Sequence, residues 1–175
     1  HPDCGIAYGI TRLTDLEGKV LKSPFKWTDK KLQYLFPGLL VDRWWCTHTP
    51  LYRRNIADKI GPWIDLRYSQ DWEYDSRAGA MGVKIITCST LVSDHRTHAE
   101  NRQTGHGKWL DPKDRVRFFS LLFDHAIKAG VKLESPEMKH FSRWVFLNAR
   151  QCGQLGDSKA AKACFESALN AADGT

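Results

Sequence analysis

The stretch QDWEYDSRAGAMGVKIITCSTLV, residues 70–92, decides the fold class. Its first part, residues 71–82, has apolar side chains at helical intervals and ends in a glycine, which predicts a helix. The positions expected to face inward are Trp72, Ala78 and Met81. Residues 83–92 are rich in β-branched side chains and predict a strand. A helix followed by a strand is typical of an α/β fold.

Short elements are predicted upstream of this stretch. Residues 4–14 are apolar and β-leaning, and the glycine three residues after Asp15 indicates the turn of a hairpin. Thr28 is a candidate cap for a short helix over residues 30–36, ended by a Pro-Gly pair. Residues 39–41 are then expected to run extended.

Two further segments flank the predicted strand. Residues 51–60 predict a short helix that ends at Gly61, because their apolar side chains recur at helical intervals. Residues 93–109 are polar and lack periodicity, which predicts a loop of the kind that often carries function. Asp111 followed by Pro112 is typical of a helix start.

The C-terminal part of the chain predicts helices only. The helix that starts at Asp111 should run to about Ala129, and residues 137–172 predict two helices hinged at residues 155–157. Apolar residues in this pair have the spacing of one tetratricopeptide-like hairpin. They are Val145, Ala149, Cys152, Ala161, Phe165 and Ala168. We therefore expect an α/β part over residues 1–110 and a helical extension over residues 111–175. The hairpin is interpreted as a C-terminal cap or the start of a longer helical region, with a groove that docks a protein partner as the alternative.

Composition bounds the class of protein. The 175 residues are 42% hydrophobic and include 8 Phe, 7 Trp and 5 Tyr, which is enough to fill a sizeable core. The five cysteines lack a Cys-x-x-Cys pair, which favours free thiols in a reducing cytoplasm. The net charge of +6 is dispersed, which suits anionic phosphates or an anionic membrane surface better than a nucleic-acid groove. We expect a cytoplasmic protein, with any membrane contact at the inner face, and no nucleic-acid partner.

Asp71 is the candidate catalytic residue. A carboxylate at a helix start, flanked by Trp72 and Tyr74, can take a proton from a hydroxyl group, and a tryptophan offers an apolar face to a sugar ring. The alternative is that Asp71 only caps the helix that follows it. Local chemistry leaves both interpretations open.

The order of short motifs favours the catalytic interpretation. The motifs are Tyr52-Arg53-Arg54, Ile60-Gly61-Pro62-Trp63, Asp71-Trp72-Glu73-Tyr74, Arg77-Ala78, Gly82-Val83-Lys84-Ile85 and Arg96-Thr97-His98. This ordered set resembles the acceptor-side half of inverting family-2 nucleotide-sugar glycosyltransferases, over about residues 3–105. The resemblance implies part of a GT-A fold, transfer of a sugar from a nucleotide-diphosphate donor to a glycan or other hydroxyl acceptor, and Asp71 as the base. Gln70 departs from the Glu-Asp pair of that family and leaves the role of a second carboxylate in doubt.

The resemblance also implies roles for other residues. His98 would complete the coordination of Mn²⁺ or Mg²⁺ at the diphosphate leaving group, with Arg96 as a phosphate contact or structural ion pair. The candidate substrate-binding residues are Trp72, His48, Arg53, Arg54 and Arg96. An alternative metal site, for structural zinc, would combine Cys88, His95, His98 and His106, a spacing that fits no common zinc pattern.

One motif of the family is missing from the sequence. No Asp-x-Asp occurs in the 175 residues, so the donor-binding half and most of the cation ligands are expected to precede residue 1. We accordingly expect this chain to be a fragment that is inactive alone. The competing class is a non-catalytic module that binds a glycan through its aromatic surface or a protein through its helical tail.

Overall fold

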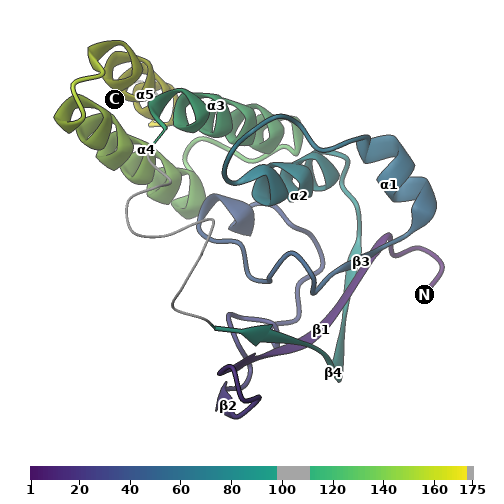
Figure 1. Ribbon diagram of the computed structural model, residues 1–175. Helices are drawn as coiled ribbons and strands as arrows, with labels where there is room; N and C mark the ends of the chain where they lie inside the picture. Colours follow the sequence, from purple (N-terminus) through teal and green to yellow (C-terminus); the bar gives the residue numbers. More distant parts are fainter. Residues whose placement is uncertain (98–110, 173–175) are drawn as a thin grey trace.

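A computed structural model describes residues 1–97 and 111–172 of the chain. The described residues form a mixed α/β fold with a small four-stranded sheet and five α-helices (Figure 1). The strands lie at one end of the molecule and the three C-terminal helices lie at the other. The α/β prediction is confirmed at this level. Within the described residues, no helix combines the length and the apolar character needed to cross a membrane.

The central strand of the sheet is β1 (Ile6–Thr14). Strand β4 (Ile85–Arg96) runs parallel to β1 along its whole length, and β2 (Val20–Lys22) and β3 (Leu51–Tyr52) pair antiparallel with the two ends of β1. The register between β1 and β4 shifts around Gly9, where a Cβ would lie 2.6 Å from the Thr90 carbonyl oxygen. Glycine is therefore required where β4 bulges over β1.

Three of the five described α-helices begin directly after a residue whose side chain caps them. The bounds of the five helices are α1 (Arg54–Ile60), α2 (Gln70–Ala80), α3 (Pro112–Lys128), α4 (Pro136–Gln154) and α5 (Ser158–Ala171). The side chains of Asp111, Ser135 and Asp157 accept hydrogen bonds from backbone amides in the first turns of α3, α4 and α5. The predicted β-hairpin of β1 and β2, the helix after Asp111 and the final pair of helices are confirmed.

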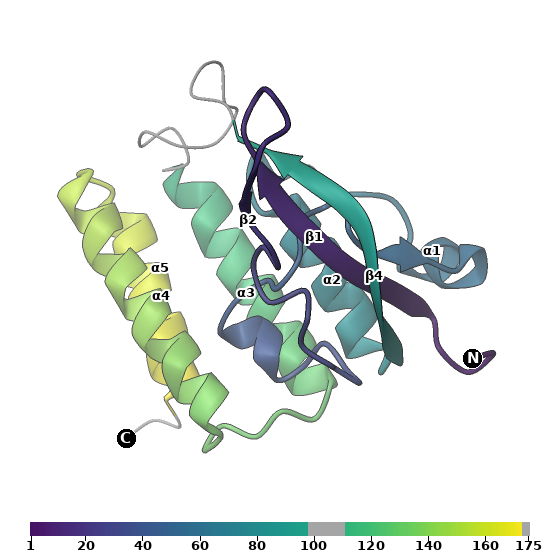
Figure 2. The ribbon, with the colours of Figure 1, turned by 90° about the horizontal axis from the view of Figure 1, so that it is seen from below.

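The helical extension and the sheet-bearing part share one hydrophobic core among the described residues. Figure 2 shows α3 between α2 and the α4–α5 pair, and the α2–α3 contact is extensive. The Trp72 ring on α2 packs against Phe118 of α3 and Trp144 of α4, with centroid distances of 5.8 and 5.3 Å. The predicted boundary near residue 110 falls in residues 98–110, outside the described part. The helical extension therefore packs against the side of α2 that faces away from the sheet.

Several local predictions are wrong. Residues 30–36 form bends and irregular backbone instead of a helix. Residues 39–41 are not extended, because Gly38–Leu40 forms a 3₁₀ helix that buries both leucines. The predicted helix over residues 51–60 begins only at Arg54, because Leu51 and Tyr52 pair with β1. In each case tertiary packing overrides the local sequence preference.

Three burial or boundary predictions are also corrected. Met81 is exposed because α2 has already ended at Ala80. Phe165 is exposed on α5, where smaller side chains face α4 instead. The loop predicted to start at residue 93 begins later, since residues 93–96 still pair with β1. The rest of that predicted loop lies outside the described residues, apart from Thr97.

Candidate functional site

Asp71 occupies the first turn of α2, where its side chain remains 30% exposed. One carboxylate oxygen, Oδ2, accepts hydrogen bonds from Thr47 Oγ1 at 2.6 Å and from Arg43 Nη1 at 2.8 Å. The other oxygen, Oδ1, accepts one from the Trp72 amide at 2.8 Å. The N-cap position belongs to Ser69, so Asp71 is a first-turn residue, where a negative charge is favoured by the helix dipole.

Arg43 is the buried cation of this site. Its Nη1 atom contacts Asp71, and its Nε atom lies 2.6 Å from Oδ2 of Asp75. Burial disfavours the charged guanidinium, but the two carboxylates outweigh that effect and raise the pKa of Arg43. Arg43 therefore stays positively charged, and its charge opposes the rise that burial causes in the pKa of Asp75.

Asp75 lies one helical turn after Asp71 and is almost completely buried. It accepts hydrogen bonds from Arg43, from Trp45 Nε1 at 2.8 Å and from the Tyr52 hydroxyl. Burial raises the pKa of the Asp75 carboxyl, and these hydrogen bonds oppose the rise. Burial and the Asp75 charge raise the pKa of Tyr52 as well. Asp75 thus joins α2 to the segment that contains Arg43 and Trp45, and to Tyr52 on β3.

The two tryptophans near α2 have different environments. Trp72, the predicted sugar-binding tryptophan, faces the core, and its Nε1 donates a hydrogen bond to the Leu39 carbonyl at 3.0 Å. Trp63 is 49% exposed and stacks on Tyr74, with ring centroids 5.4 Å apart and planes 22° apart. Tyr74 follows Asp71 by three residues, so both side chains are on one face of α2. The exposed aromatic platform therefore belongs to Trp63.

The predicted arginines are separated in space and in role. Arg53 donates from Nε to the Cys4 carbonyl at 2.6 Å and from Nη2 to the His1 carbonyl at 3.0 Å, and so holds the N-terminal segment. Arg54 is exposed at the first position of α1. Arg96 is exposed at the end of β4. His98, the predicted metal ligand, lies outside the described residues.

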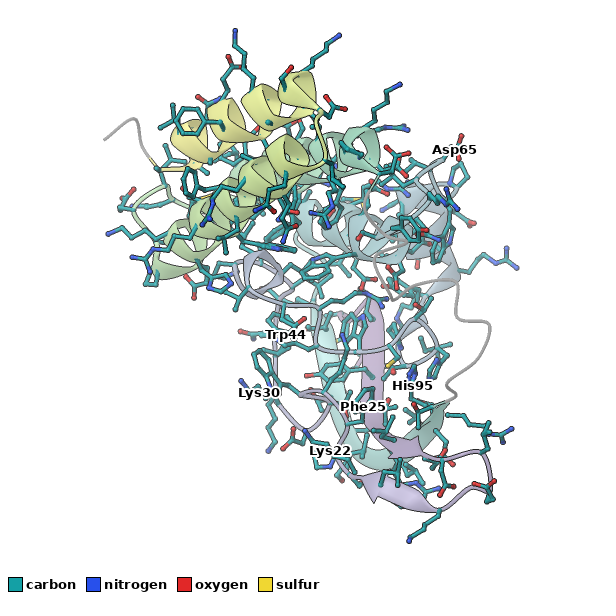
Figure 3. The ribbon with its side chains drawn as sticks, turned by 60° about the vertical axis from the view of Figure 1, so that its left-hand side comes forward. Lys22, Phe25, Lys30, Trp44, Asp65 and His95 are labelled. Atoms are coloured by element: carbon teal, nitrogen blue, oxygen red, sulfur yellow. The ribbon has the colours of Figure 1, made fainter. Side chains whose placement is uncertain are left out.

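A group of metal-ligating side chains lies at the end of the sheet. Cys46, His48 and His95 each offer a ligand atom, and these atoms all lie within 4.8 Å of one another. The His95 ring is stacked between Phe25, at 5.2 Å, and His48, at 5.7 Å, and Figure 3 shows His95 and Phe25 together at this end. His48 is exposed, and partial burial of its ring together with the Arg43 charge lowers its pKa.

This group differs from both metal sites that the sequence predicts. Cys88, which belongs to the alternative zinc set, is exposed on β4. His95, from the same set, lies instead beside Cys46 and His48. A thiol and two imidazoles suit Zn²⁺ and are poor ligands for Mg²⁺ or Mn²⁺, which prefer oxygen. This group is therefore a different kind of site from the expected Mn²⁺ or Mg²⁺ site, whose predicted ligand His98 lies outside the described residues.

Sequence reasoning missed the residues that hold Asp71. Arg43 and Thr47 lie in a segment without a recognisable motif, 28 and 24 residues before Asp71. Asp75 carried a usable signal, because a second carboxylate four residues after Asp71 falls on the same helix face. Comparisons with protein-family models, with curated proteins and with solved structures find no match to this chain. The function is therefore inferred from the chemistry of the residues and from their ordered motifs.

Proposed function

We propose that the protein is a glycosyltransferase of GT-A-like fold, which moves a sugar from a nucleotide-diphosphate donor to a hydroxyl acceptor with inversion. Asp71 is the general base. The observation that carries the proposal is a partly exposed carboxylate at the start of α2, held by Arg43 and Thr47. A general base must be both oriented and accessible, and Asp71 combines the two properties.

The chemical step is a single displacement. The acceptor oxygen forms a bond to the anomeric carbon of the donor while the bond from that carbon to the diphosphate oxygen breaks. The acceptor proton moves to Asp71, and the nucleotide diphosphate leaves with the bonding electron pair. Each carboxylate oxygen has two lone pairs, so Asp71 can accept this proton in addition to its hydrogen bonds.

Other exposed residues supply a surface for the acceptor. Trp63 on Tyr74 offers a flat apolar face, and His48 lies in the same segment as Thr47, which contacts Asp71. Trp72 is left out of this surface because its partly buried ring packs against the core. The predicted cation ligand His98 lies outside the described residues, so the step is described through Asp71 and the acceptor surface alone.

Asp71→Asn in the full-length protein tests the proposal. The amide cannot take the acceptor proton, so turnover should fall by at least about a hundredfold. Binding of the nucleotide-diphosphate sugar, measured by calorimetry, should remain close to that of the wild type. Asp58→Asn is the matched control, because Asp58 is an exposed carboxylate on α1. Near-normal turnover of Asp71→Asn would assign the base to another residue.

A non-catalytic glycan- or protein-binding module is the second candidate. The exposed Trp63 ring favours a sugar surface, and the exposed apolar side chains of α4 and α5 favour a protein partner for the tail. These apolar side chains are Phe146, Leu147, Phe165 and Leu169. Such a module binds its ligand without turnover, and Asp71→Asn should leave binding unchanged. Turnover that depends on Asp71 would exclude this candidate.

A further inference from the structure

We infer that Cys46, His48 and His95 form a binding site for Zn²⁺ or a similar borderline cation. Its ligands differ from those predicted for the cation at the diphosphate. It rests on the placement of one thiol and two imidazoles from two distant segments, residues 46–48 and β4. The inference of a metal site therefore does not depend on the proposed glycosyl transfer.

The ligand atoms of the three side chains are already close to the spacing that a zinc ion requires. A tetrahedral zinc ion, with Zn–S near 2.3 Å and Zn–N near 2.0 Å, holds its ligand atoms about 3.5 Å apart. The ligand atoms of this group lie within 4.8 Å of one another. Closing the remaining gap of about 1 Å needs only side-chain rotation, because His48 is exposed and can turn.

A tight turn sets the first two ligands. The Thr49 amide donates to the Cys46 carbonyl at 2.9 Å, and Thr49 Oγ1 accepts from the Cys46 amide at 3.3 Å. Thr49 Oγ1 is also 2.8 Å from Thr11 Oγ1 on β1, which is 2.9 Å from Ser93 Oγ on β4. This row of hydroxyl groups fixes the turn against strands β1 and β4.

The third ligand is fixed by β4. The preceding residue, Asp94, binds Arg12 of β1 through two hydrogen bonds of 2.8 and 2.9 Å, which sets the register of the two strands there. The Phe25 ring supports the opposite face of His95 from His48. The supporting contacts thus hold the backbone of the turn and the His95 ring before any ion binds, and only the exposed His48 side chain has to rotate.

The ligand set selects the ion and has a structural consequence. Thiolate and imidazole favour Zn²⁺ and Co²⁺ over Mg²⁺, and three protein ligands leave the fourth position to water or to a substrate atom. The ion would tie the segment with Thr47 to the end of β4. Because Thr47 Oγ1 donates to Asp71 at 2.6 Å, the ion would also hold the partner of Asp71 in place.

Co²⁺ titration of the reduced 175-residue chain tests the inference directly. We expect one ion per chain, a near-ultraviolet charge-transfer band from a Co²⁺–thiolate bond, and intense visible bands of a four-coordinate ion. Zn²⁺ should abolish these bands and Mg²⁺ should not. At a free Zn²⁺ concentration of about 100 times Kd, the unfolding equilibrium should shift about a hundredfold toward the folded state.

Variants identify the ligands. Cys46→Ser should remove the charge-transfer band, and His48→Gln, at an exposed position that tolerates change, should weaken Co²⁺ binding by at least about tenfold. Cys88→Ser and His140→Gln are matched controls at exposed positions and should bind as the wild type does. A folded wild-type chain without a thiolate band would overturn the inference. So would a band that survives Cys46→Ser, or one lost instead in Cys152→Ser, a residue whose thiol contacts that of Cys164.

Discussion

Asp71 and Asp75 lie one helical turn apart on α2 and bind the same guanidinium group, that of Arg43. The side chain of Asp75 is 2% exposed and that of Asp71 is 30% exposed. The two carboxylates therefore share a counter-ion but differ in their exposure to solvent. Asp75 joins the elements around the site, and the proposed function needs Asp71 as the carboxylate that an acceptor can reach.

Asparagine at each position should separate the two roles. Asp75→Asn leaves the buried Arg43 short of a partner and should lower the free energy of unfolding by about 3 kcal/mol. Asp71→Asn removes a partly solvated ion pair and should lower it by less than about 1 kcal/mol. Urea unfolding of both variants measures the difference. Equal destabilisation would mean that Asp71 is as structural as Asp75.

The two tryptophans offer a second comparison. Trp72→Ala removes a ring packed on Phe118 and Trp144 and should destabilise the protein by about 3 kcal/mol. Trp63→Ala removes an exposed ring from Tyr74 and should change stability by about 1 kcal/mol or less. If Trp63 contacts the acceptor, Trp63→Ala should also raise the KM for acceptor about fivefold at similar kcat. An unchanged KM would remove Trp63 from the acceptor surface.

Local signals predicted the parts of the fold in which neighbouring residues decide the structure. Asp111 with Pro112 fixes the start of α3, and the turn after Asp15 fixes the β1–β2 hairpin, because capping and turn geometry act within a few residues. Residues 39–41 were misassigned because Leu39 and Leu40 respond to the core around them. A buried apolar pair does not distinguish a strand from a helical turn.

The candidate site was predicted only in part for a related reason. Asp71 could be found because its helix and its motif are local. Arg43 could not, because its importance depends on two carboxylates that follow it by 28 and 32 residues. The Cys46–His48–His95 group likewise depends on the pairing of β1 with β4, a long-range contact that single-residue patterns do not contain.

The five thiols should differ in reactivity. Cys88 is exposed and Cys4 is half-buried, whereas Cys46, Cys152 and Cys164 are buried. Burial raises the pKa of these three thiols, that of Cys164 to about 12, which depletes the reactive thiolate. An aromatic disulfide reagent should therefore modify two thiols rapidly in the native chain and five in denaturant. Rapid modification of a third thiol would contradict the packing of Cys46 or of the α4–α5 contact.

The contact between His125 on α3 and Ser76 on α2 should make stability depend on pH. His125 Nδ1 lies 2.7 Å from Ser76 Oγ. Burial lowers the pKa of His125; the charges of Arg77 and Lys128 lower it further, and Asp124 opposes them. In the unfolded chain His125 has the usual histidine pKa of 6.5. As the pH falls, His125 therefore takes up a proton in the unfolded chain at a higher pH than in the folded chain.

The sign of the effect follows from that order. The stabilising contribution of neutral His125 is fully present above pH 6.5 and is lost as the pH falls through the lower folded pKa. Urea unfolding of the wild type at a series of pH values below 6.5 should show this loss, and His125→Gln should show a smaller one. His140→Gln, at an exposed histidine of α4, should keep the wild-type slope. Identical slopes for His125→Gln and the wild type would show that His125 does not titrate between the two states, and that the α2–α3 contact does not depend on its neutral form.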